Sequence, residues 1–383
     1  MTTEAPHPQR FRVLVAGGGI AALETALALQ DLAAEHVETT MLAPNEELVY
    51  RPMSVREPFG YGIAARYPLG SIAADAGAQL VSGKVAWVEP EAQLVHTDTG
   101  AQLEYDALVV AMGAMQYRRY EQAITIDDRH MDELLHGLIQ DLECGFLESV
   151  AFVVPGRMAW PLPLYELALM LAGRAEDMCV PLDATMITPE EHPLAIFGQA
   201  VSDGVHALLA EKRIRTISSA YVEIPAPGRI VVNPGDRRVA AQRVIALPEL
   251  YGPGVQGLPL SEHGFLRVDR HCQMRDVGPV FAVGDVVDFP VKQGGIACQQ
   301  ADAAAQRIAA LAGADVEPQL FKPYLNAMLL TDGRPRYLAA EITGGCGAAS
   351  RFSDVPMDGV THKVAGRYLA PYLARLDREG VTA

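Results

Sequence analysis

Residues 11–29 read FRVLVAGGGIAALETALAL. The apolar run at the start of this stretch predicts a buried strand, and its second half has the spacing of a helix. Gly17, Gly19 and Ala22 stand between them in the order G-x-G-x-x-A. The first glycine permits a tight turn, the second lets the backbone approach a pyrophosphate, and the small third residue lets helix and strand pack closely. The pattern predicts a dinucleotide-binding turn, with a purely structural glycine turn as the alternative.

The next expected strand, Val37 to Leu42, ends without the acidic residue that accepts hydrogen bonds from an adenosine ribose in such folds. Ala43 stands in that place. Glu46 or Glu47 can supply a carboxylate from the following loop, and the alternative is that both are solvated loop charges. The sequence leaves open how the ribose would be held.

Length and composition limit the class of protein. A chain of 383 residues, 50% of them hydrophobic, is long enough for two or three domains with large cores. Its net charge of −16 argues against general nucleic-acid binding and against electrostatic docking on an anionic membrane. No apolar run approaches the roughly 20 residues of a membrane-spanning helix, and the polar N-terminus does not resemble a signal peptide.

The cysteines lie far apart and form no C-x-x-C motif, which argues against a disulfide framework and against a structural zinc site. They are Cys144, Cys179, Cys272, Cys298 and Cys346. We therefore expect a cytoplasmic protein in a reducing compartment, with no transmembrane segment and no metal site.

Two later segments carry a family resemblance. Tyr105 to Ala114 is a buried strand that ends in a small-residue turn, and Val280 to Asp285 is a strand that ends in a carboxylate at a turn. With the glycine turn, these segments resemble the FAD-dependent pyridine nucleotide-disulfide oxidoreductase superfamily, over roughly Arg12 to Leu338. Met112 departs from the threonine usual in the turn of the segment from Tyr105 to Ala114. The resemblance implies an α/β fold with two Rossmann-like domains plus a short C-terminal region, and FAD as cofactor.

Within that superfamily the chain resembles the branch of sulfide:quinone oxidoreductases and type II NADH:quinone oxidoreductases. The motifs are VYRP at residues 49–52, YELA at residues 165–168 and PVKQGG at residues 290–295. The resemblance implies an FAD-binding domain from residues 10–115 and 258–320, an NAD(P)-binding-like domain at 116–257, and a C-terminal region at 321–383. It also implies the FAD-binding residues, which are Gly17, Gly19, Ala22, Arg51, Pro52, Gly113, Gly284, Asp285 and Gly294.

The second domain lacks its own glycine motif. Residues 155–163 read PGRMAWPLP, with one glycine, three prolines and a tryptophan, which remove donors and block close approach of a phosphate. NAD(P)H is therefore only weakly supported as an additional cofactor. The resemblance also places Trp160, and a residue near 328–330, where sulfide:quinone oxidoreductases carry cysteines, so sulfide chemistry is disfavoured.

Three residues are candidates for catalysis. Glu166 can exchange protons if its carboxyl is buried, or it can favour the dipole at a helix start. Lys292, at the start of a helix, can stabilise anionic reduced flavin, or it can be an ordinary surface or capping lysine. Cys298 can become a thiolate near that helix start, or it can pack in the core. Trp160 and Tyr165 can stack on a flavin or belong to the core.

The resulting hypothesis is an FAD-dependent oxidoreductase that passes electrons from a small donor to a quinone-like or other small acceptor. A binding or scaffold protein with the same fold and weakened catalysis is the alternative. Apolar residues between Val364 and Leu376 recur at helical spacing. This segment can make peripheral membrane contact, dock on its own chain or form a homodimer.

Overall fold

The computed structural model describes residues 10–127, 130–157, 160–343, 346–357 and 362–380. Its first unit contains a five-stranded parallel sheet in the order β20-β9-β1-β2-β5. The strands are β1 (Phe11–Ala16), β2 (Val37–Ala43), β5 (Ala78–Ser82), β9 (Ala107–Val110) and β20 (Val280–Ala282). The sheet therefore joins the N-terminal strands to a strand that lies far along the chain.

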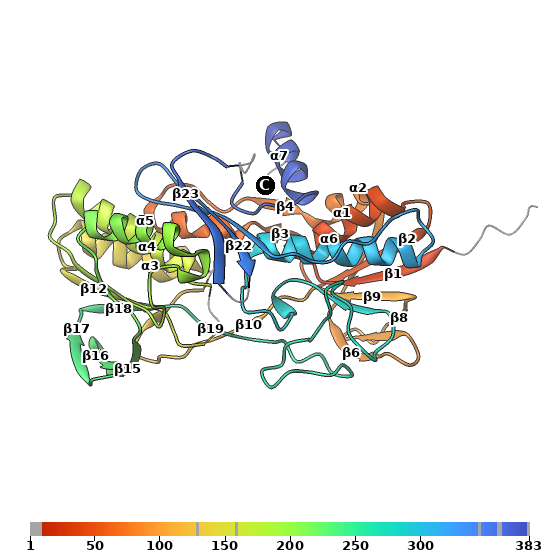
Figure 1. The fold of residues 1–383 in the computed structure, drawn as a ribbon, viewed down its shortest axis with the longest axis horizontal. Coiled ribbons are helices and arrows are strands. Elements are labelled where there is room, and N and C mark those ends of the chain that lie inside the picture. Colours follow the sequence, from red (N-terminus) through yellow and green to blue (C-terminus); the bar gives the residue numbers. More distant parts are fainter. Residues whose placement is uncertain (1–9, 128–129, 158–159, 344–345, 358–361, 381–383) are drawn as a thin grey trace, which may run out of the picture.

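Helices α1 (Ile20–Ala33) and α6 (Gly294–Leu311) cover one face of this sheet side by side (Figure 1). Val13 and Val15 of β1 pack toward these helices, whereas Leu14 and Ala16 pack toward a small antiparallel sheet on the opposite face. This alternation follows from the two-residue period of a strand buried on both faces. The small sheet consists of β6 (Val85–Glu89), β7 (Leu94–Thr97) and β8 (Gln102–Glu104). Shorter elements complete the unit: β3 (Glu47–Val49), η1 (Arg51–Phe59), β4 (Arg66–Pro68), α2 (Leu69–Asp75) and η3 (Gly284–Val286).

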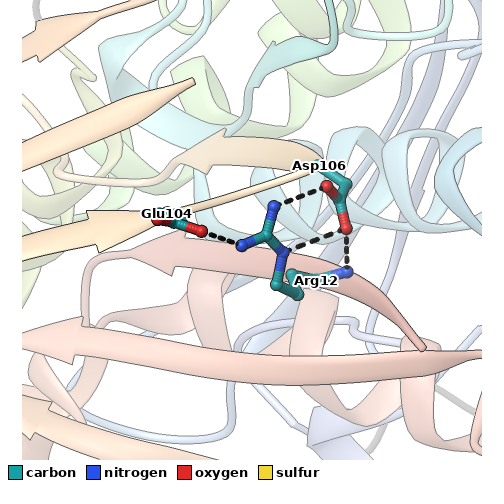
Figure 2. A network of polar contacts seen from close by, with 3 residues as sticks. All are labelled: Arg12, Glu104 and Asp106. Atoms are coloured by element: carbon teal, nitrogen blue, oxygen red, sulfur yellow. Dashed lines mark hydrogen bonds and ion pairs between the residues drawn. The ribbon is translucent and has the colours of Figure 1, made fainter. Parts of the chain in front are cut away.

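Arg12 fastens the start of β1 to the segment between β8 and β9 (Figure 2). Its backbone N–H donates to Asp106 Oδ2 at 2.8 Å, and its Nη2 donates to Asp106 Oδ1 at 2.9 Å. The guanidinium also contacts the more exposed Glu104. These hydrogen bonds lower the pKa of Asp106 below its ordinary value.

The second unit repeats the plan with a five-stranded parallel sheet in the order β11-β18-β12-β13-β14. Its strands are β11 (Ile124–Thr125), β12 (Ser149–Val153), β13 (Asp183–Ile187), β14 (Arg215–Ile217) and β18 (Arg243–Ala246). Its helical elements are α3 (Met131–Glu143), α4 (Leu162–Asp177), η2 (Ala195–Phe197) and α5 (Gln199–Glu211). A second antiparallel sheet contains β15 (Tyr221–Ala226), β16 (Arg229–Asn233) and β17 (Arg237–Ala240). The predicted α/β fold with two Rossmann-like units is confirmed.

The two units lie side by side along the long axis of the molecule, connected by the ribbon of β10 (Met115–Tyr117) and β19 (Glu249–Tyr251) (Figure 1). The C-terminal region adds an antiparallel sheet between them. Its strands are β21 (Tyr324–Leu329), β22 (Arg336–Thr343) and β23 (Cys346–Ser353). Gln299 of α6 donates to the Tyr324 carbonyl at 2.8 Å, and the Val201 N–H of α5 donates to Ser350 Oγ at 3.1 Å, so this sheet contacts both units. The exact domain boundaries stay a prediction.

The chain then forms α7 (Leu369–Glu379), at the position where the sequence predicts helical spacing. Leu369, Leu373 and Leu376 of α7 are buried in the same core cluster as α1 and α6. The apolar face of this helix thus packs on the first unit of its own chain. Within the described ranges, no helix has both the length and the apolar character needed to cross a bilayer.

Candidate functional site

The glycine turn opens toward free space at the N-terminus of α1. Gly17 has φ of +145°, and a Cβ there would overlap the carbonyl oxygen of Ala111, so only glycine fits. Gly19 is the N-cap residue of α1, and a Cβ built on it meets nothing within 4 Å. No side chain caps this helix. Open space in front of an uncapped helix N-terminus is what a pyrophosphate requires, so the turn fits a dinucleotide.

Other predicted cofactor-binding segments converge on this turn. Gly284 of η3 has φ of +78°, and a Cβ there would lie 3.0 Å from the Cβ of Ala21 in α1. Gly294 begins α6, and its Cβ would lie 3.4 Å from Ile20 Cδ1, at the start of α1. Gly113, with φ of +74°, again faces open space. The N-termini of α1 and α6 therefore meet beside the turn that carries Asp285. Ala22 is fully buried in α1, and Arg51 and Pro52 open η1.

Lys292 is a buried residue of this site, not a surface lysine. It is 5% exposed, and its Nζ donates to the Asp285 carbonyl oxygen at 3.0 Å and to the Val287 carbonyl oxygen. The same ammonium group lies 3.9 Å from the ring centroid of Phe265. Burial lowers the pKa of Lys292 to about 8. The lysine thus braces the turn that carries Asp285.

Glu166 is fully buried in α4, one turn beyond its start, and pairs with Lys363. Its Oε2 lies 2.6 Å from Lys363 Nζ, and its Oε1 accepts the Leu330 N–H at 2.8 Å. Glu166 is thus a buried, ion-paired carboxylate, and its role in proton exchange stays a prediction. Burial raises the pKa of Glu166 and lowers the pKa of Lys363, while their attraction opposes both shifts.

The pair lies beside the converging helix termini. A Cβ on Gly294, the first residue of α6, would lie 2.8 Å from Val364, the neighbour of Lys363. Sequence reasoning missed Lys363 as a site residue. No local signal marks it, because its partner is 197 positions away in the chain.

Cys298 is a buried core residue, as in the packing alternative. It lies in the first two turns of α6 and is 1% exposed in the core cluster shared with α1. Burial raises its pKa well above the ordinary value, and the nearby carboxylates of Glu24 and Asp302 raise it further. Of the two alternatives for Cys298, these observations favour packing in the core over a thiolate, because burial beside two acidic groups outweighs the helix N-terminus. The side chain of Cys346 lies outside the described residues.

In the second unit an aromatic ring lies against the single glycine of the loop after β12. A Cβ on Gly156, in the loop after β12, would lie 2.8 Å from the ring of Tyr221. Tyr165 is fully buried and its hydroxyl donates to Glu190 at 2.9 Å. Trp160 packs on Phe197 with ring centroids 5.8 Å apart. Tyr165 and Trp160 therefore belong to the core of this unit. Glu47 of the first unit, an alternative ribose ligand, pairs with Arg66 at 3.2 Å.

No protein-family model matches the chain. An NADH dehydrogenase-like protein of Mycobacterium tuberculosis is 27% identical over 293 residues, which cover 72% of each chain. The sulfide-quinone reductase of Aquifex aeolicus is 25% identical over 73% of this chain and 69% of its own. The solved sulfide:quinone oxidoreductase from Aquifex aeolicus superposes with a TM-score of 0.78 at 22% identity, over 90% of this chain and 87% of its own. NDH2 from Plasmodium falciparum superposes with a TM-score of 0.68 at 11% identity, over 98% and 95%.

The glycine turn, the converging helix termini and these relatives define an FAD-dependent oxidoreductase. In sequence and fold the chain is similar to sulfide-quinone reductase and NADH dehydrogenase-like members of the pyridine nucleotide-disulfide oxidoreductase superfamily. These sequence relatives are named as oxidoreductases, which favours the enzyme over the scaffold alternative.

Proposed function

We propose that this enzyme passes two electrons from a small donor to a quinone-like acceptor, and that the Glu166–Lys363 pair supplies protons to that acceptor. The buried ion pair carries the proposal. Its carboxyl and amine lie 2.6 Å apart and are buried beside the start of α6. Apolar residues of similar volume would stabilise a core equally well, so a buried titratable pair here favours a role in proton transfer.

Residues of the first unit would hold the cofactor. Gly17, Gly19 and Ala22 would place its pyrophosphate on the N-terminus of α1, and Asp285 would bind the ribityl chain. Lys292 would support the cofactor indirectly by bracing the turn that carries Asp285. FAD supplies the two-electron chemistry that links donor and acceptor when it is bound. Glycine at 113, 284 and 294, with Arg51 and Pro52, would complete the site.

Proton transfer accounts for the pair. Reduction of a quinone to a quinol takes up two electrons and two protons. Glu166 and Lys363 would donate one of these protons to a quinone oxygen and be reprotonated from solvent, and the other proton would arrive with the electron pair from the reduced flavin. Burial raises the pKa of Glu166 and lowers the pKa of Lys363, which brings the two values closer together. A proton would therefore pass between the two groups more easily than in an exposed pair. Cys298, with its raised thiol pKa, is the weaker catalytic candidate.

The residues of the second unit and the C-terminal region restrict which electron donors are expected. The ring of Tyr221 covers Gly156, which argues against NAD(P)H bound in the standard cradle. Trp160, and leucine or methionine near residues 328–330, stand where the resemblance expects the thiols of sulfide oxidation. We therefore infer a small donor that reaches the flavin without a nucleotide cradle in the second unit.

The burial of the apolar face of α7 supports docking on its own chain over peripheral membrane contact by that face. A cytoplasmic location and a homodimer stay predictions.

The proposal is tested by absorption spectroscopy of the purified, FAD-loaded protein under anaerobic conditions. The flavin is reduced chemically, and its reoxidation by a water-soluble quinone is followed in a stopped-flow instrument. We expect reoxidation within seconds, and about a hundredfold slower reoxidation in Glu166→Gln. Equal rates in the two proteins would overturn the role of the pair. Addition of NADH or sulfide to the oxidised protein tests the donor, and we expect neither to bleach the flavin rapidly.

A further inference from the structure

The segment that carries Lys363 is held by buried acceptors on the first unit. The Val364 N–H donates to the hydroxyl oxygen of Tyr50 at 3.0 Å. The N–H groups of Tyr368 and Leu369 donate to the two carboxylate oxygens of Glu24, at 2.9 and 2.6 Å. Glu24 thus binds the start of α7 six residues beyond Lys363.

Glu24 is an unusual residue for its position. It is fully buried in α1, whose neighbouring residues are small or apolar, and α1 packs along α6. A buried carboxylate costs several kcal/mol unless it is fully hydrogen-bonded. Here the Glu24 carboxylate accepts hydrogen bonds from the first N–H groups of α7, a helix whose N-cap residue provides no side-chain cap. The partial positive charge of that helix end favours a carboxylate.

The turn between Lys363 and α7 passes directly over this carboxylate. A Cβ on Gly366 would lie 2.7 Å from Glu24 Oε2 and 3.0 Å from Cys298 Sγ. A side chain therefore cannot be placed there without displacing the turn. Gly366 is three positions beyond Lys363 in the chain, a span of at most about 10 Å. The contacts of Glu24 and the ammonium group of Lys363 therefore belong to one short segment of the chain.

The charged groups around Glu24 come from two elements. From α6 it faces Cys298 and Asp302, and from the C-terminal segment it faces Arg367 and the start of α7. Tyr50 lies near Cys298. Asp302 Oδ1 is buried without a hydrogen-bond partner among the described residues. Burial and Glu24 raise the pKa of Asp302 to about 8, against the effect of Arg367. Burial also raises the pKa of Glu24, while the backbone N–H groups of Arg367, Tyr368 and Leu369 oppose that shift.

We propose that Glu24 is a positioning residue, which anchors the turn from Lys363 to Leu369 so that the ammonium group of Lys363 stays on Glu166. The inference rests on the proposed role of the Glu166–Lys363 pair. Tyr50 is the second anchor of the same segment, because it binds the residue next to Lys363.

The test is a double-mutant cycle in FAD-loaded, full-length protein, read as the rate and pH profile of flavin reoxidation by a water-soluble quinone. We expect Glu24→Ala to slow reoxidation about tenfold and to move the pH profile, and Glu24→Gln, which keeps one acceptor oxygen, to slow it about threefold. Lys363→Met with Glu24→Ala should react no more slowly than Lys363→Met alone. Asp75→Asn, which weakens the exposed contacts of Asp75 with Tyr372 and Arg375 of α7, away from the start of that helix, is the matched control and should leave the rate unchanged.

The outcomes separate the two proposals. If Glu166→Gln and Lys363→Met leave reoxidation unchanged, the proposed function fails. If those two variants slow the reaction and Glu24→Ala does not, the positioning role of Glu24 fails. Additive effects in the double variant would also overturn it, because they would show that Glu24 acts independently of Lys363. If Glu24→Ala does not fold, the same cycle is run with Glu24→Gln and Tyr50→Phe.

Discussion

Lys363 Nζ and Glu166 Oε2 lie 2.6 Å apart in the interior of the protein, although 197 residues separate them in the chain. The side chains are 6% and 0% exposed, so neither charge is solvated. The two charges neutralise each other, and the Leu330 N–H donates a further hydrogen bond to the Glu166 carboxylate. The pair joins the second unit to the C-terminal segment, and its integrity therefore affects both stability and the proposed chemistry.

Removal of one partner should destabilise the protein strongly. Glu166→Gln leaves the Lys363 ammonium buried without a counter-charge, which costs about 3–5 kcal/mol in the free energy of unfolding. The double variant Glu166→Gln with Lys363→Met removes both charges and should recover most of that loss, yet reoxidation by quinone should stay slow. Denaturant unfolding, with the flavin reoxidation rate beside it, measures both. Recovery of the rate together with the stability would show that the pair is only structural.

The carboxyl of Asp302 should make stability depend on pH. Its pKa is about 8 in the folded protein and about 3.9 in an unfolded chain. Its contribution to stability is thus fully present below about pH 4 and is lost as the pH rises to about 8. Asp302→Asn abolishes this titration and keeps a donor toward Glu24.

We therefore expect Asp302→Asn to be more stable than the parent protein by at least about 1 kcal/mol at pH 8, with the difference shrinking toward pH 4. Denaturant unfolding at several pH values measures it. Asp315→Asn, at an exposed position, is the control and should change nothing. A difference that does not vary with pH would contradict the raised pKa.

The ion pair of Arg12 and Asp106 at the start of β1 should make stability increase with pH, opposite to the effect of Asp302. Arg12 lowers the pKa of Asp106, so this carboxylate stabilises the fold above its unfolded pKa of about 3.9, and the contribution is lost as the pH falls below that value. Asp106→Asn should cost about 1 kcal/mol at pH 7 and progressively less in acid. Glu104→Gln should cost nothing measurable, because the Glu104 side chain is 68% exposed. An equal loss in both variants at pH 7 would refute this distinction.

Flavin binding should depend on the glycine at position 17 for a steric reason. A Cβ there would overlap the Ala111 carbonyl oxygen, so Gly17→Ala must displace the turn that faces the cofactor. We expect a loss of at least tenfold in FAD affinity, measured as bound flavin after purification and by titration of the apoprotein.

Gly100→Ala is the matched control. Gly100 also has a positive φ, of +86°, but a Cβ there meets nothing within 4 Å. It should lose about 1 kcal/mol of stability and no flavin. Equal flavin content in the two variants would argue that the turn does not contact the cofactor.

Local sequence is sufficient to predict the strand, turn and helix at residues 11–29. The apolar periodicity indicates the strand and the helix, and a glycine at position 17 permits the positive φ of the turn. The same holds for α7, whose apolar spacing is visible in the chain. The class of cofactor follows from such local motifs together with the family resemblance.

The partners of Glu166, Lys292, Cys298 and Glu24 follow from tertiary packing alone. Sequence could indicate that a carboxyl opens a helix or that a thiol lies near a helix start, yet the pKa of each group depends on burial and on charges that arrive from other elements. Lys363 reaches Glu166, and the start of α7 reaches Glu24, only because the C-terminal segment returns across both units. Local pattern therefore determines which elements form, whereas the desolvation and pairing that give the candidate site its chemistry arise only when distant segments pack together.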